Sequence, residues 1–561
     1  MQRHWLNAYP DGVPGEVDLS RYGSLVALLD EAFRSYADRN AYVGFGVPMT
    51  FGELDARSRA FAAWLQSTGL RKGDRVAIML PNVLQYPIAL AGVLRAGLVI
   101  VNVNPLYTPR ELEHQLKDSG ARAIIILENF AHVLQQVIDR TSVETVVVTA
   151  MGDLLGGLKG LLVNTVVRHV KKMVPAWDLP DAIRLRDAIG EGGSLRLQDP
   201  GVSHEDLAVL QYTGGTTGLS KGAALSHRNL IANLLQSEAW MQPALNNPRR
   251  PIGQGEQLVV VCALPLYHIF AFTICALLGM RTGAVNILIP NPRDLNALVK
   301  ELRPHRVHVF PAVNTLYNAL VHHEGFGQLD FSRLVVSNGR GMAVQAATAQ
   351  KWLELTGCPI CEGYGLSETS PSATCNPTDT ESYSGTIGLP IPSTDIAILD
   401  DEGRHLAVGE TGEIAIRGPQ VMTGYWQRPD ETARVMTADG FFRSGDIGVM
   451  DERGFVRIVD RKKDMILVSG FNVYPNEVEQ VASAHPGVLE AAAVGTPDEH
   501  SGEAVKLFVV RKDETLTAEQ LMAHCAGQLA GYKRPRHIEF RPELPKTNVG
   551  KILRRALREA A

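Results

Sequence analysis

Continuous apolar strands alternate with helical segments in the first third of the chain, and this alternation constrains the fold more than any other feature. Residues 75–80, 98–103 and 123–127 are predicted strands that are apolar on both faces. A helix is predicted over 84–96, and Thr108-Pro-Arg-Glu111 is a capping box that opens another helix. Such strands, separated by helices, are typical of a parallel sheet that is covered on both sides. We therefore predict an α/β fold.

The middle of the chain repeats the pattern. Residues 207–212 are a predicted strand, and a helix is predicted over about 227–240. Residues 307–310 and 334–336 have the composition of further buried strands. Together with the first third, these segments predict a large N-terminal lobe made of parallel α/β subdomains.

The pattern changes from about residue 395. Short alternating runs, such as residues 412–417, predict a small antiparallel, β-barrel-like subdomain over about 395–460. Strands and helices mix again towards the end of the chain. We therefore predict a large domain over residues 1–460 and a small α+β domain over residues 461–561.

Composition excludes several classes of protein. The 561 residues carry a net charge of −5, which gives no general attraction to nucleic acid. No run approaches the ~18 apolar residues of a membrane-spanning helix. Residues 1–10 lack the apolar core of a secretion signal, and six cysteines in so long a chain do not form a disulfide framework. We expect a cytoplasmic protein that binds no nucleic acid.

Residues 211–222 concentrate the residue types that bind phosphate. Glycines allow backbone N–H groups to approach an anion, and hydroxyl groups and an ammonium group add donors. The Walker pattern G-x-x-x-x-G-K-[ST] fails, because Ser220 stands at its second glycine and Gly222 at its Ser or Thr. The sequence therefore predicts a phosphate loop of another kind. Its candidate residues are Thr213, Gly214, Gly215, Thr216, Thr217, Gly218 and Lys221.

Several further segments, taken with this loop, resemble the acyl-adenylate-forming (AMP-binding) superfamily, which contains acyl-CoA synthetases, luciferases and adenylation domains of peptide synthetases. In the order and spacing of that family they are residues 212–222, 364–369, 425–426 with 443–446, 460–470, and 545–551. The likeness is greatest to the bacterial long-chain fatty-acid–CoA ligases. The resemblance implies that a fatty acid is activated with ATP to acyl-AMP, with release of pyrophosphate. Coenzyme A then forms the thioester, with release of AMP.

Both reactants of the first step are anions. Two unit charges ~4 Å apart repel by about 1 kcal/mol in water and by about 4 kcal/mol at an effective dielectric constant of about 20. Cations must therefore be in place before the carboxylate attacks the α-phosphate. The resemblance implies Mg²⁺ held by Glu368 and Thr217, because hard oxygen ligands suit that ion. It also implies that Lys551 bridges the carboxylate and the α-phosphate.

The resemblance assigns the nucleotide site residue by residue. Tyr364 would stack on adenine, and Asp446 would accept hydrogen bonds from both ribose hydroxyls. Arg461 would reinforce the ribose and the phosphates. Ser367 stands where many relatives carry Thr, so the hydroxyl beside the α-phosphate is retained. The remaining nucleotide-binding candidates are Gly339, Gly341, Glu362, Gly363 and Gly365.

Two more positions match the family. His268 corresponds to a residue beside the acyl carboxylate. Lys463 corresponds to the hinge about which the small domain would rotate, so that coenzyme A can reach the acyl-adenylate. Both are predictions from the resemblance, because a lone histidine is more often a packed core residue and a basic turn is often only a surface feature.

The chain departs from the family at Arg340. A loop of small residues lines adenine and the acyl entrance in the family, and here it is Ser337-Asn-Gly-Arg-Gly-Met342. Three alternatives are open for the guanidinium: it narrows the acyl channel, pairs with the carboxylate, or turns out to solvent. Arg340 is therefore expected to affect the chain-length preference.

Residues 154–174 combine apolar side chains with Lys159, Arg168, Lys171 and Lys172. Such a helix can lie on an anionic bilayer. The alternative is a surface helix that packs on its own domain. We therefore hypothesise that the protein associates peripherally with the inner face of the membrane through this segment. A homodimer is a separate hypothesis.

Two alternative functions compete with the ligase. The first is an enzyme that stops at the adenylate and passes the acyl group to a carrier protein; the hinge motif disfavours it. The second is a fatty-acid-binding or signalling relative that Arg340 has disabled. The presence of Glu368, Asp446 and Lys551 disfavours it.

Overall fold

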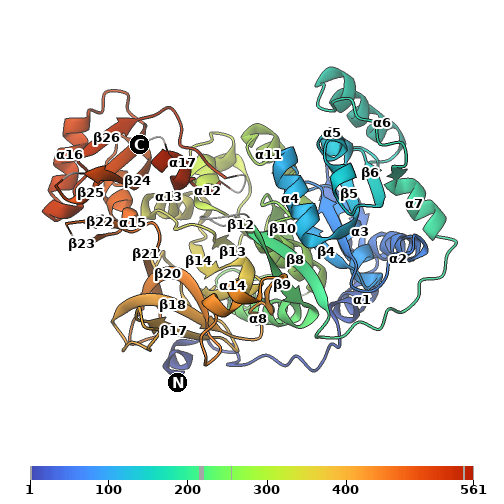
Figure 1. Cartoon of the computed structure of the whole chain (residues 1–561), viewed down its shortest axis with the longest axis horizontal. Coiled ribbons are helices and arrows are strands. Elements are labelled where there is room, and N and C mark those ends of the chain that lie inside the picture. The colour runs from blue at the N-terminus through green and yellow to red at the C-terminus, as the bar shows by residue number, and fades with distance from the viewer. Residues whose placement is uncertain are drawn as a thin grey trace.

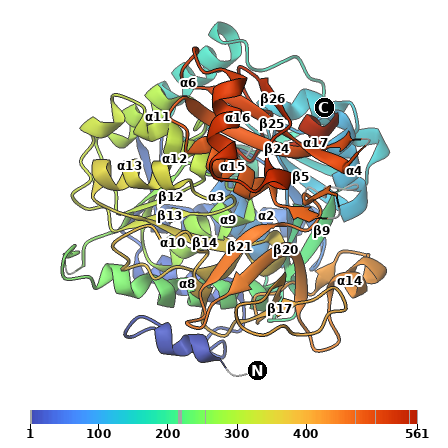
Figure 2. The ribbon, with the colours of Figure 1, turned by 90° about the vertical axis from the view of Figure 1, so that its left-hand side faces the viewer.

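The computed structural model of the chain describes residues 3–213, 220–253, 255–469, 471–498, 500–547 and 550–559. A large body carries most of the chain, and a smaller C-terminal lobe, drawn in red, stands beside it (Figure 1). Figure 2 looks at that side of the molecule and shows the small lobe in front of the large body. Within these described ranges, the strands form four sheets.

The first sheet confirms the predicted parallel core. Its eight strands lie in the order β19-β9-β8-β4-β3-β5-β6-β7. All neighbours from β8 to β7 pair in parallel, whereas β9 and β19 join antiparallel at one edge. The bounds are β3 Arg75–Met79, β4 Val99–Asn102, β5 Ala121–Leu127, β6 Thr145–Thr149, β7 Ile183–Arg184, β8 Leu207–Thr213, β9 Lys221–Ser226 and β19 Gly424–Tyr425.

Helices bury both faces of this sheet. Val76 and Ile78 of β3 belong to one apolar core, whereas Ala77 and Met79 belong to a second core on the opposite face. This double burial explains the continuous apolar strands. The covering helices are α2 Phe51–Ser67, α3 Gln85–Arg95, α4 Pro109–Ser119, α5 Ala131–Gln135 and α7 Leu185–Gly192. The predicted capping box is present at the start of α4.

The second sheet has nine strands in the order β16-β15-β14-β13-β12-β10-β11-β1-β2. Its centre is parallel, and the predicted strands at 307–310 and 334–336 are β12 and β13, each beginning two residues later than predicted. The bounds are β1 Asn40–Gly44, β2 Val47–Thr50, β10 Val259–Cys262, β11 Val285–Leu288, β12 Val309–Ala312, β13 Val336–Gly339, β14 Ile360–Gly365, β15 Ser372–Cys375 and β16 Leu389–Pro390.

The helices associated with the second sheet follow the same alternation. The helix predicted over about 227–240 is α8, which extends to Leu245. The bounds are α1 Leu25–Ser35, α8 His227–Leu245, α9 Ile269–Ala271, α10 Leu278–Arg281, α11 Leu295–Leu302, α12 Asn314–Val321 and α13 Ala346–Thr356, with a π-helical turn over Phe272–Leu277.

The predicted antiparallel subdomain is a four-stranded sheet in the order β17-β18-β20-β21. All three pairs of neighbours are antiparallel. The bounds are β17 Asp395–Leu399, β18 Thr411–Arg417, β20 Phe442–Met450 and β21 Val456–Arg461, with α14 at Pro429–Val435. In the sequence, this sheet follows the strands of the second sheet and precedes the C-terminal lobe.

The C-terminal lobe has a five-stranded sheet and a core of its own, as predicted for a small α+β domain. The chain enters it between β21 and β22, where the boundary near 460–463 is predicted. The bounds are β22 Ile466–Val468, β23 Phe471–Val473, β24 Val488–Asp498, β25 Gly502–Arg511, β26 His537–Phe540, α15 Pro475–Ser483, α16 Ala518–Ala526 and α17 Arg554–Glu559.

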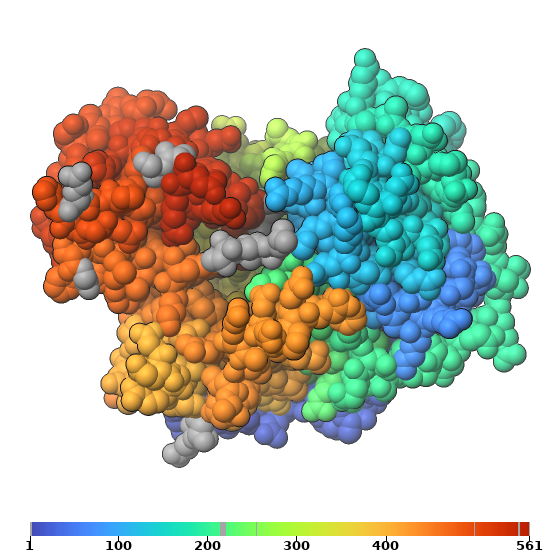
Figure 3. All heavy atoms as spheres, in the orientation of Figure 1, coloured from blue at the N-terminus to red at the C-terminus, as the bar shows by residue number. Residues whose placement is uncertain are grey.

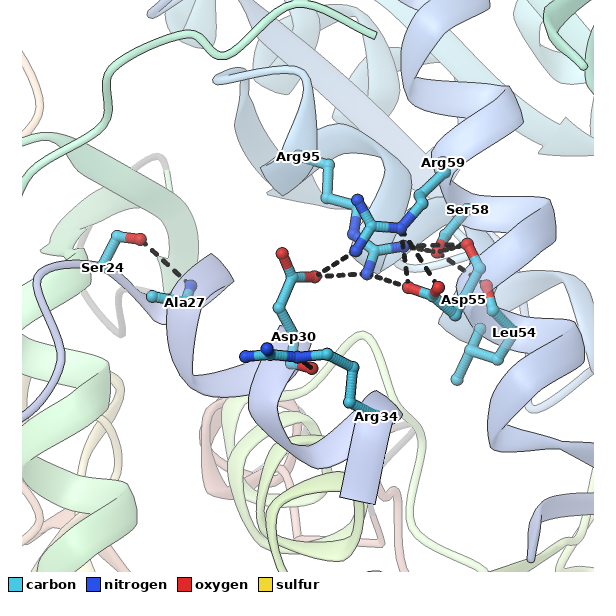
Figure 4. Close-up of polar contacts among 9 residues, drawn as sticks. All are labelled: Ser24, Ala27, Asp30, Arg34, Leu54, Asp55, Ser58, Arg59 and Arg95. Carbon is cyan, nitrogen blue, oxygen red and sulfur yellow. Dashed lines mark hydrogen bonds and ion pairs between the residues drawn. The ribbon is translucent and has the colours of Figure 1, made fainter. Parts of the chain in front are cut away.

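Arg95 joins three helices of the large body through a buried guanidinium (Figure 4). Its Nη2 contacts the carboxylates of Asp30 on α1 and Asp55 on α2, and its Nη1 donates to Ser58 Oγ at 2.5 Å. Arg95 is only 4% exposed, and its guanidinium also lies over the Phe33 ring. A buried cation is costly unless it is paired, so this cluster fixes the meeting point of α1, α2 and α3.

The segment predicted to be an amphipathic basic helix forms α6 (Gly157–Thr165) and a π-helical turn over Val166–Val170. It projects from the upper right of the molecule in Figure 1, and the space-filling view in Figure 3 shows it standing out from the surface. The large apolar side chains exposed here are Leu158, Leu161, Leu162, Val170 and Met173. In the described ranges, no helix is long and apolar enough to cross a membrane.

Candidate active site

The predicted site residues converge at the end of β14, facing β20, β21 and the C-terminal lobe. Tyr364 on β14 donates from its hydroxyl group to Asp446 Oδ2 at 2.6 Å. Arg461 Nε lies 3.4 Å from Asp446 Oδ1, because β20 and β21 pair these two residues directly. Tyr364 and Asp446 are buried. The strands therefore bring together a predicted adenine-stacking ring, a ribose acceptor and a cation.

Glu368 lies directly beyond β14, on a short 3-10 turn over Ser367–Thr369. Its carboxylate is buried and accepts a hydrogen bond from the Tyr425 hydroxyl at 2.8 Å. Burial raises the pKa of Glu368, and the Tyr425 hydrogen bond opposes that shift. Lys221 Nζ lies 5.0 Å from the centre of the same Tyr425 ring and pairs with Glu431 on α14. Tyr425 thus stands between the predicted metal ligand and a lysine of the phosphate loop.

The donor set suits Mg²⁺ that is bound mainly through the phosphates of a substrate. Glu368 supplies a carboxylate, and Mg²⁺ is usually held by one or two carboxylates together with phosphates and water. Among the residues that the structure describes, no group of three or more His, Cys, Asp or Glu side chains could hold a metal. Glu368 would therefore hold the ion together with ATP.

Part of the predicted phosphate loop falls outside the described residues. Gly214, Gly215, Thr216, Thr217 and Gly218 belong to that part. Its two ends are described: Thr213 closes β8 and Lys221 opens β9, and the two residues pair across the antiparallel ladder. The loop positions therefore remain predictions, including Thr217 as a metal ligand.

Lys551 reaches the large body from a turn in the C-terminal lobe. Its backbone N–H donates to Thr547 Oγ1 at 3.0 Å, and Gly550 has a φ of 82°. A Cβ atom at Gly550 would lie 2.6 Å from Thr315 Oγ1 on α12, so only glycine permits this approach. Lys551 Cε would lie 3.3 Å from a Cβ atom at Gly341. The turn thus places the lysine against the loop that follows β13.

The charges of the site act on Lys551. Burial and the positive charge of Arg461 lower the pKa of Lys551 to about 8, while Asp446 and Glu368 oppose that shift. Burial and Arg461 also lower the pKa of Lys463 to about 8. Lys551 is therefore electrostatically coupled to both carboxylates of the site, although it comes from the other lobe.

His268 precedes α9 and is held in one tautomer. The backbone N–H of Phe270 donates to His268 Nδ1 at 3.3 Å, so the neutral ring carries its proton on Nε2. Burial and the charge of Lys551 lower the pKa of His268 to about 3. The ring is therefore a neutral hydrogen-bond donor at ordinary pH and lies within the influence of Lys551.

Glycines around β13 and β14 allow close approaches that a side chain would block. A Cβ atom at Gly365 would lie 1.7 Å from the carbonyl oxygen of Pro371, and one at Gly363 would lie 2.6 Å from Arg340 Nε. Gly339 is similarly enclosed, and Gly341 faces Lys551. Glu362 belongs to β14 and accepts a hydrogen bond from Val344 N at 2.8 Å, and burial raises its pKa to about 7.

Lys463 lies between two sets of anchoring contacts. On one side, Lys462 contacts the antiparallel sheet of β17, β18, β20 and β21. Its backbone N–H donates to the carbonyl oxygen of Gly445 on β20 at 3.0 Å, and its Nζ donates to Asp401, which follows β17, at 2.7 Å. On the other side, Asp464 pairs with Arg558 of α17 at 2.8 Å. The chain is therefore tied to the large body through Lys462 and to the C-terminal lobe through Asp464, and Asp460 also accepts a hydrogen bond from Asn476 N of α15 at 2.8 Å.

Two of these contacts were not predicted from the sequence. Tyr425 belongs to a segment that carried the family resemblance, but no role followed from its position. Glu431 pairs with Lys221. The only feature that marks Glu431 is its position as an acidic residue in the first turn of α14, which does not indicate this pairing. Both contacts join residues far apart in the chain, so spacing alone could not reveal them.

The family models identify the class of protein. Residues 29–426 match the model described as AMP-binding enzyme, and residues 477–551 match the AMP-binding enzyme C-terminal domain. The chain therefore belongs to the AMP-binding enzyme family, which confirms the resemblance found in the motifs.

Individual relatives narrow the comparison. The chain is 56% identical to a long-chain-fatty-acid–CoA ligase of Escherichia coli O157:H7 over 562 residues, covering 100% of this chain and 99% of that protein. It is 38% identical to a ligase of the same name from Bacillus subtilis, covering 100% and 98%. The solved structure of the anthranilate–CoA ligase AuaEII with anthranoyl-AMP superimposes with a TM-score of 0.83 at 26% identity, covering 97% of this chain and 98% of that one.

Proposed function

We propose that the chain is an AMP-forming long-chain fatty acid–CoA ligase. The observation that supports this most directly is the position of Lys551, which the C-terminal lobe brings into the same site as Glu368 and Asp446. A site of this kind serves a reaction in which two anions must meet. The full-length similarity to proteins named long-chain-fatty-acid–CoA ligase indicates which carboxylic acid is activated.

In the first step, a carboxylate oxygen of the fatty acid attacks the α-phosphorus of ATP. The bond to pyrophosphate breaks, and the acyl-AMP mixed anhydride remains. Lys551 lies between the reacting anions and offsets their repulsion, and Arg461 adds a second positive charge on the nucleotide side. Mg²⁺ held by Glu368 and the phosphates would neutralise the leaving group.

His268 orients the acyl carboxylate in this proposal. Its Nδ1 already accepts a hydrogen bond, so Nε2–H is the group that can donate to a carboxylate oxygen. A pKa of about 3 keeps the ring neutral, which prevents it from competing with the carboxylate for a proton. His268 is therefore a positioning donor rather than an acid or a base.

In the second step, the thiolate of coenzyme A attacks the acyl carbonyl carbon. The bond to AMP breaks, and the thioester and AMP are released. Lys551 occupies the approach to the adenylate, so the C-terminal lobe must move between the steps. Lys463 is the proposed hinge, because it lies between the anchors of the two lobes. Residues 1–460 and 461–561 are accordingly the proposed moving units.

An assay of AMP release tests the proposal. Purified protein is supplied with ATP, Mg²⁺, coenzyme A and saturated or unsaturated acids from short to very long chains. We expect AMP release that depends on both the acid and coenzyme A, with the free thiol consumed in equal amount. AMP release without thiol consumption would favour transfer to a carrier protein. An absence of ATP–pyrophosphate exchange with every acid of this panel, oleate included, would favour the non-catalytic alternative.

We also propose that α6 and the residues after it dock on an anionic bilayer. Leu158, Leu161 and Leu162 are 87%, 66% and 63% exposed, which is unusual for apolar side chains on one short helix. Lys171 and Lys172 are exposed close by in the chain. Lys159 and Arg168 are engaged within the protein, with Phe45 O and Glu128 respectively. The free apolar and basic groups suit the headgroup boundary of an anionic membrane.

Sedimentation with vesicles tests this docking. The wild type should bind vesicles that contain an anionic phospholipid and not vesicles of neutral lipid alone. Charge reversal at Lys171 and Lys172 should weaken binding, whereas reversal at the exposed Lys300 on α11 should not. Equal binding by all three proteins would refute the role of this segment. The predicted homodimer stays a prediction, which a mass measurement in solution would test.

A further inference from the structure

Arg340 is buried, which excludes one of the three alternatives for its side chain. It is 9% exposed, so the guanidinium does not turn out to solvent. Its Nε donates to Asn338 Oδ1 at 2.7 Å, and its Nη1 contacts Ser372 Oγ. The guanidinium lies 5.6 Å from the centre of the Phe270 ring. It therefore points into the protein, between β13, β15 and the helical turn that follows His268.

The guanidinium occupies space that small residues leave open. A Cβ atom at Gly363 would lie 2.6 Å from Arg340 Nε and 3.0 Å from its Nη2. Gly363 alternates along β14 with Tyr364, so the two residues face opposite sides of the strand. Tyr364 faces the proposed nucleotide site. Arg340 therefore lies on the other side, where Phe270 extends the wall that begins at His268, the residue proposed to hold the acyl carboxylate.

The environment of the guanidinium is polar and includes the buried Cys375 thiol, whose pKa is lowered to about 6 by a hydrogen bond with Cys361 and by the neighbouring Arg340 charge. Within the described ranges, no carboxylate lies within ion-pair distance of Arg340. Arginine has five N–H donors; Asn338 and Ser372 accept from the Nε and Nη1 groups, and the Cys375 sulfur is a further acceptor beside the guanidinium. Asn233 on α8 and Asn338 are also buried nearby, and Asn233 bonds to Ser372 N at 3.1 Å. A hydrocarbon chain would leave the remaining donors unsatisfied, which is costly in a buried site.

We propose that Arg340 is a specificity-determining residue of the acyl pocket and that it favours fatty acids with an additional oxygen on the chain: a hydroxyl, an oxo group or a second carboxylate. This inference rests on the proposed function. An oxygen acceptor can take the unused N–H donors, whereas a methylene group cannot. A site built around a buried donor discriminates strongly against a substrate that lacks the acceptor.

Competition between matched acids tests this inference. Each enzyme is given an unsubstituted fatty acid together with an acid of the same length that carries a hydroxyl, an oxo group or a terminal carboxylate. The ratio of kcat/KM values is taken within each protein, so that a loss of overall activity cancels. Arg340→Met keeps much of the bulk and removes the donors, and Arg340→Gly removes both.

We expect both variants to lower the ratio of kcat/KM for the oxygenated acid to kcat/KM for the unsubstituted acid. The decrease should be about 10-fold or more for at least one oxygenated acid, which is the scale of one hydrogen bond to a charged group. An unchanged ratio in both variants would overturn the inference. It would also be overturned if Arg340→Met matched the wild type and only Arg340→Gly altered the profile, because bulk alone would then set the specificity. Failure of the proposed function is distinct: no acid would then support AMP release by the wild type.

Discussion

Replacement of Lys551 by alanine removes a positive charge that the C-terminal lobe brings to the loop after β13. Opposite unit charges ~4 Å apart attract by about 4 kcal/mol at an effective dielectric constant of about 20. Part of that attraction already exists before the reaction, when ATP binds. Loss of one preorganised contact with the transition state typically slows a reaction by ~100-fold or more, which is about 2.7 kcal/mol. We therefore expect Lys551→Ala to slow acyl-AMP formation by at least this factor.

The two half-reactions are measured separately. ATP–pyrophosphate exchange with oleate reports the first step, and thioester formation from supplied oleoyl-AMP reports the second. The first should fall and the second should be spared, because Lys551 must leave the site before the thiol enters. Lys546→Ala is the matched control: this lysine belongs to the same turn region but pairs with Glu490 at 2.6 Å. Equal losses in both steps, or an equal loss in the control, would refute the reasoning.

Three further predictions concern the site and the fold. Glu368→Gln should raise the Mg²⁺ concentration needed for half-maximal activity by about 10-fold or more; an unchanged Mg²⁺ titration would contradict the assignment. The kcat/KM for the first step should fall as pH rises through about 8, because Lys551 loses its proton there. The variant Lys551→Arg should keep its charge to higher pH, so a parallel decline in both proteins would assign the titration to another group. Arg95→Met should cost about 2–3 kcal/mol of unfolding free energy, since it removes the buried partner of the Asp30 and Asp55 carboxylates, which then keep only the more exposed Arg59; a loss below about 1 kcal/mol in urea unfolding would show that the cluster is not a strong tie.

Much of the fold could be predicted because the hydrophobic pattern of short segments agrees with the packing that the complete fold requires. Strands such as β3 are apolar on both faces because helices cover both sides of the sheet, and that pattern is visible in a single sequence. The capping box at Thr108 and Glu111 fixed the start of α4, because both partners lie within one turn. The starts of β12 and β13 were misplaced by two residues, since apolar residues continue the pattern into the preceding loops.

The orientation of site residues depended on contacts that the sequence does not encode locally. Arg340 was visible as a departure from a family pattern, but its inward direction depends on Phe270 and Ser372, which come from distant segments. The hydrogen bond from Tyr425 to Glu368 spans 57 positions of the chain. Motif spacing could therefore identify which residues gather, and only the fold could show how they face one another.

Oxygen tracing tests the central claim most directly. Oleate labelled with ¹⁸O in its carboxyl group is turned over with ATP and coenzyme A, and the nucleotide product is analysed by mass spectrometry. If a carboxylate oxygen becomes bonded to the α-phosphorus, the product must be AMP, and one ¹⁸O atom must appear in its phosphate for each labelled acid consumed. Release of ADP, with the label in inorganic phosphate, would contradict the account.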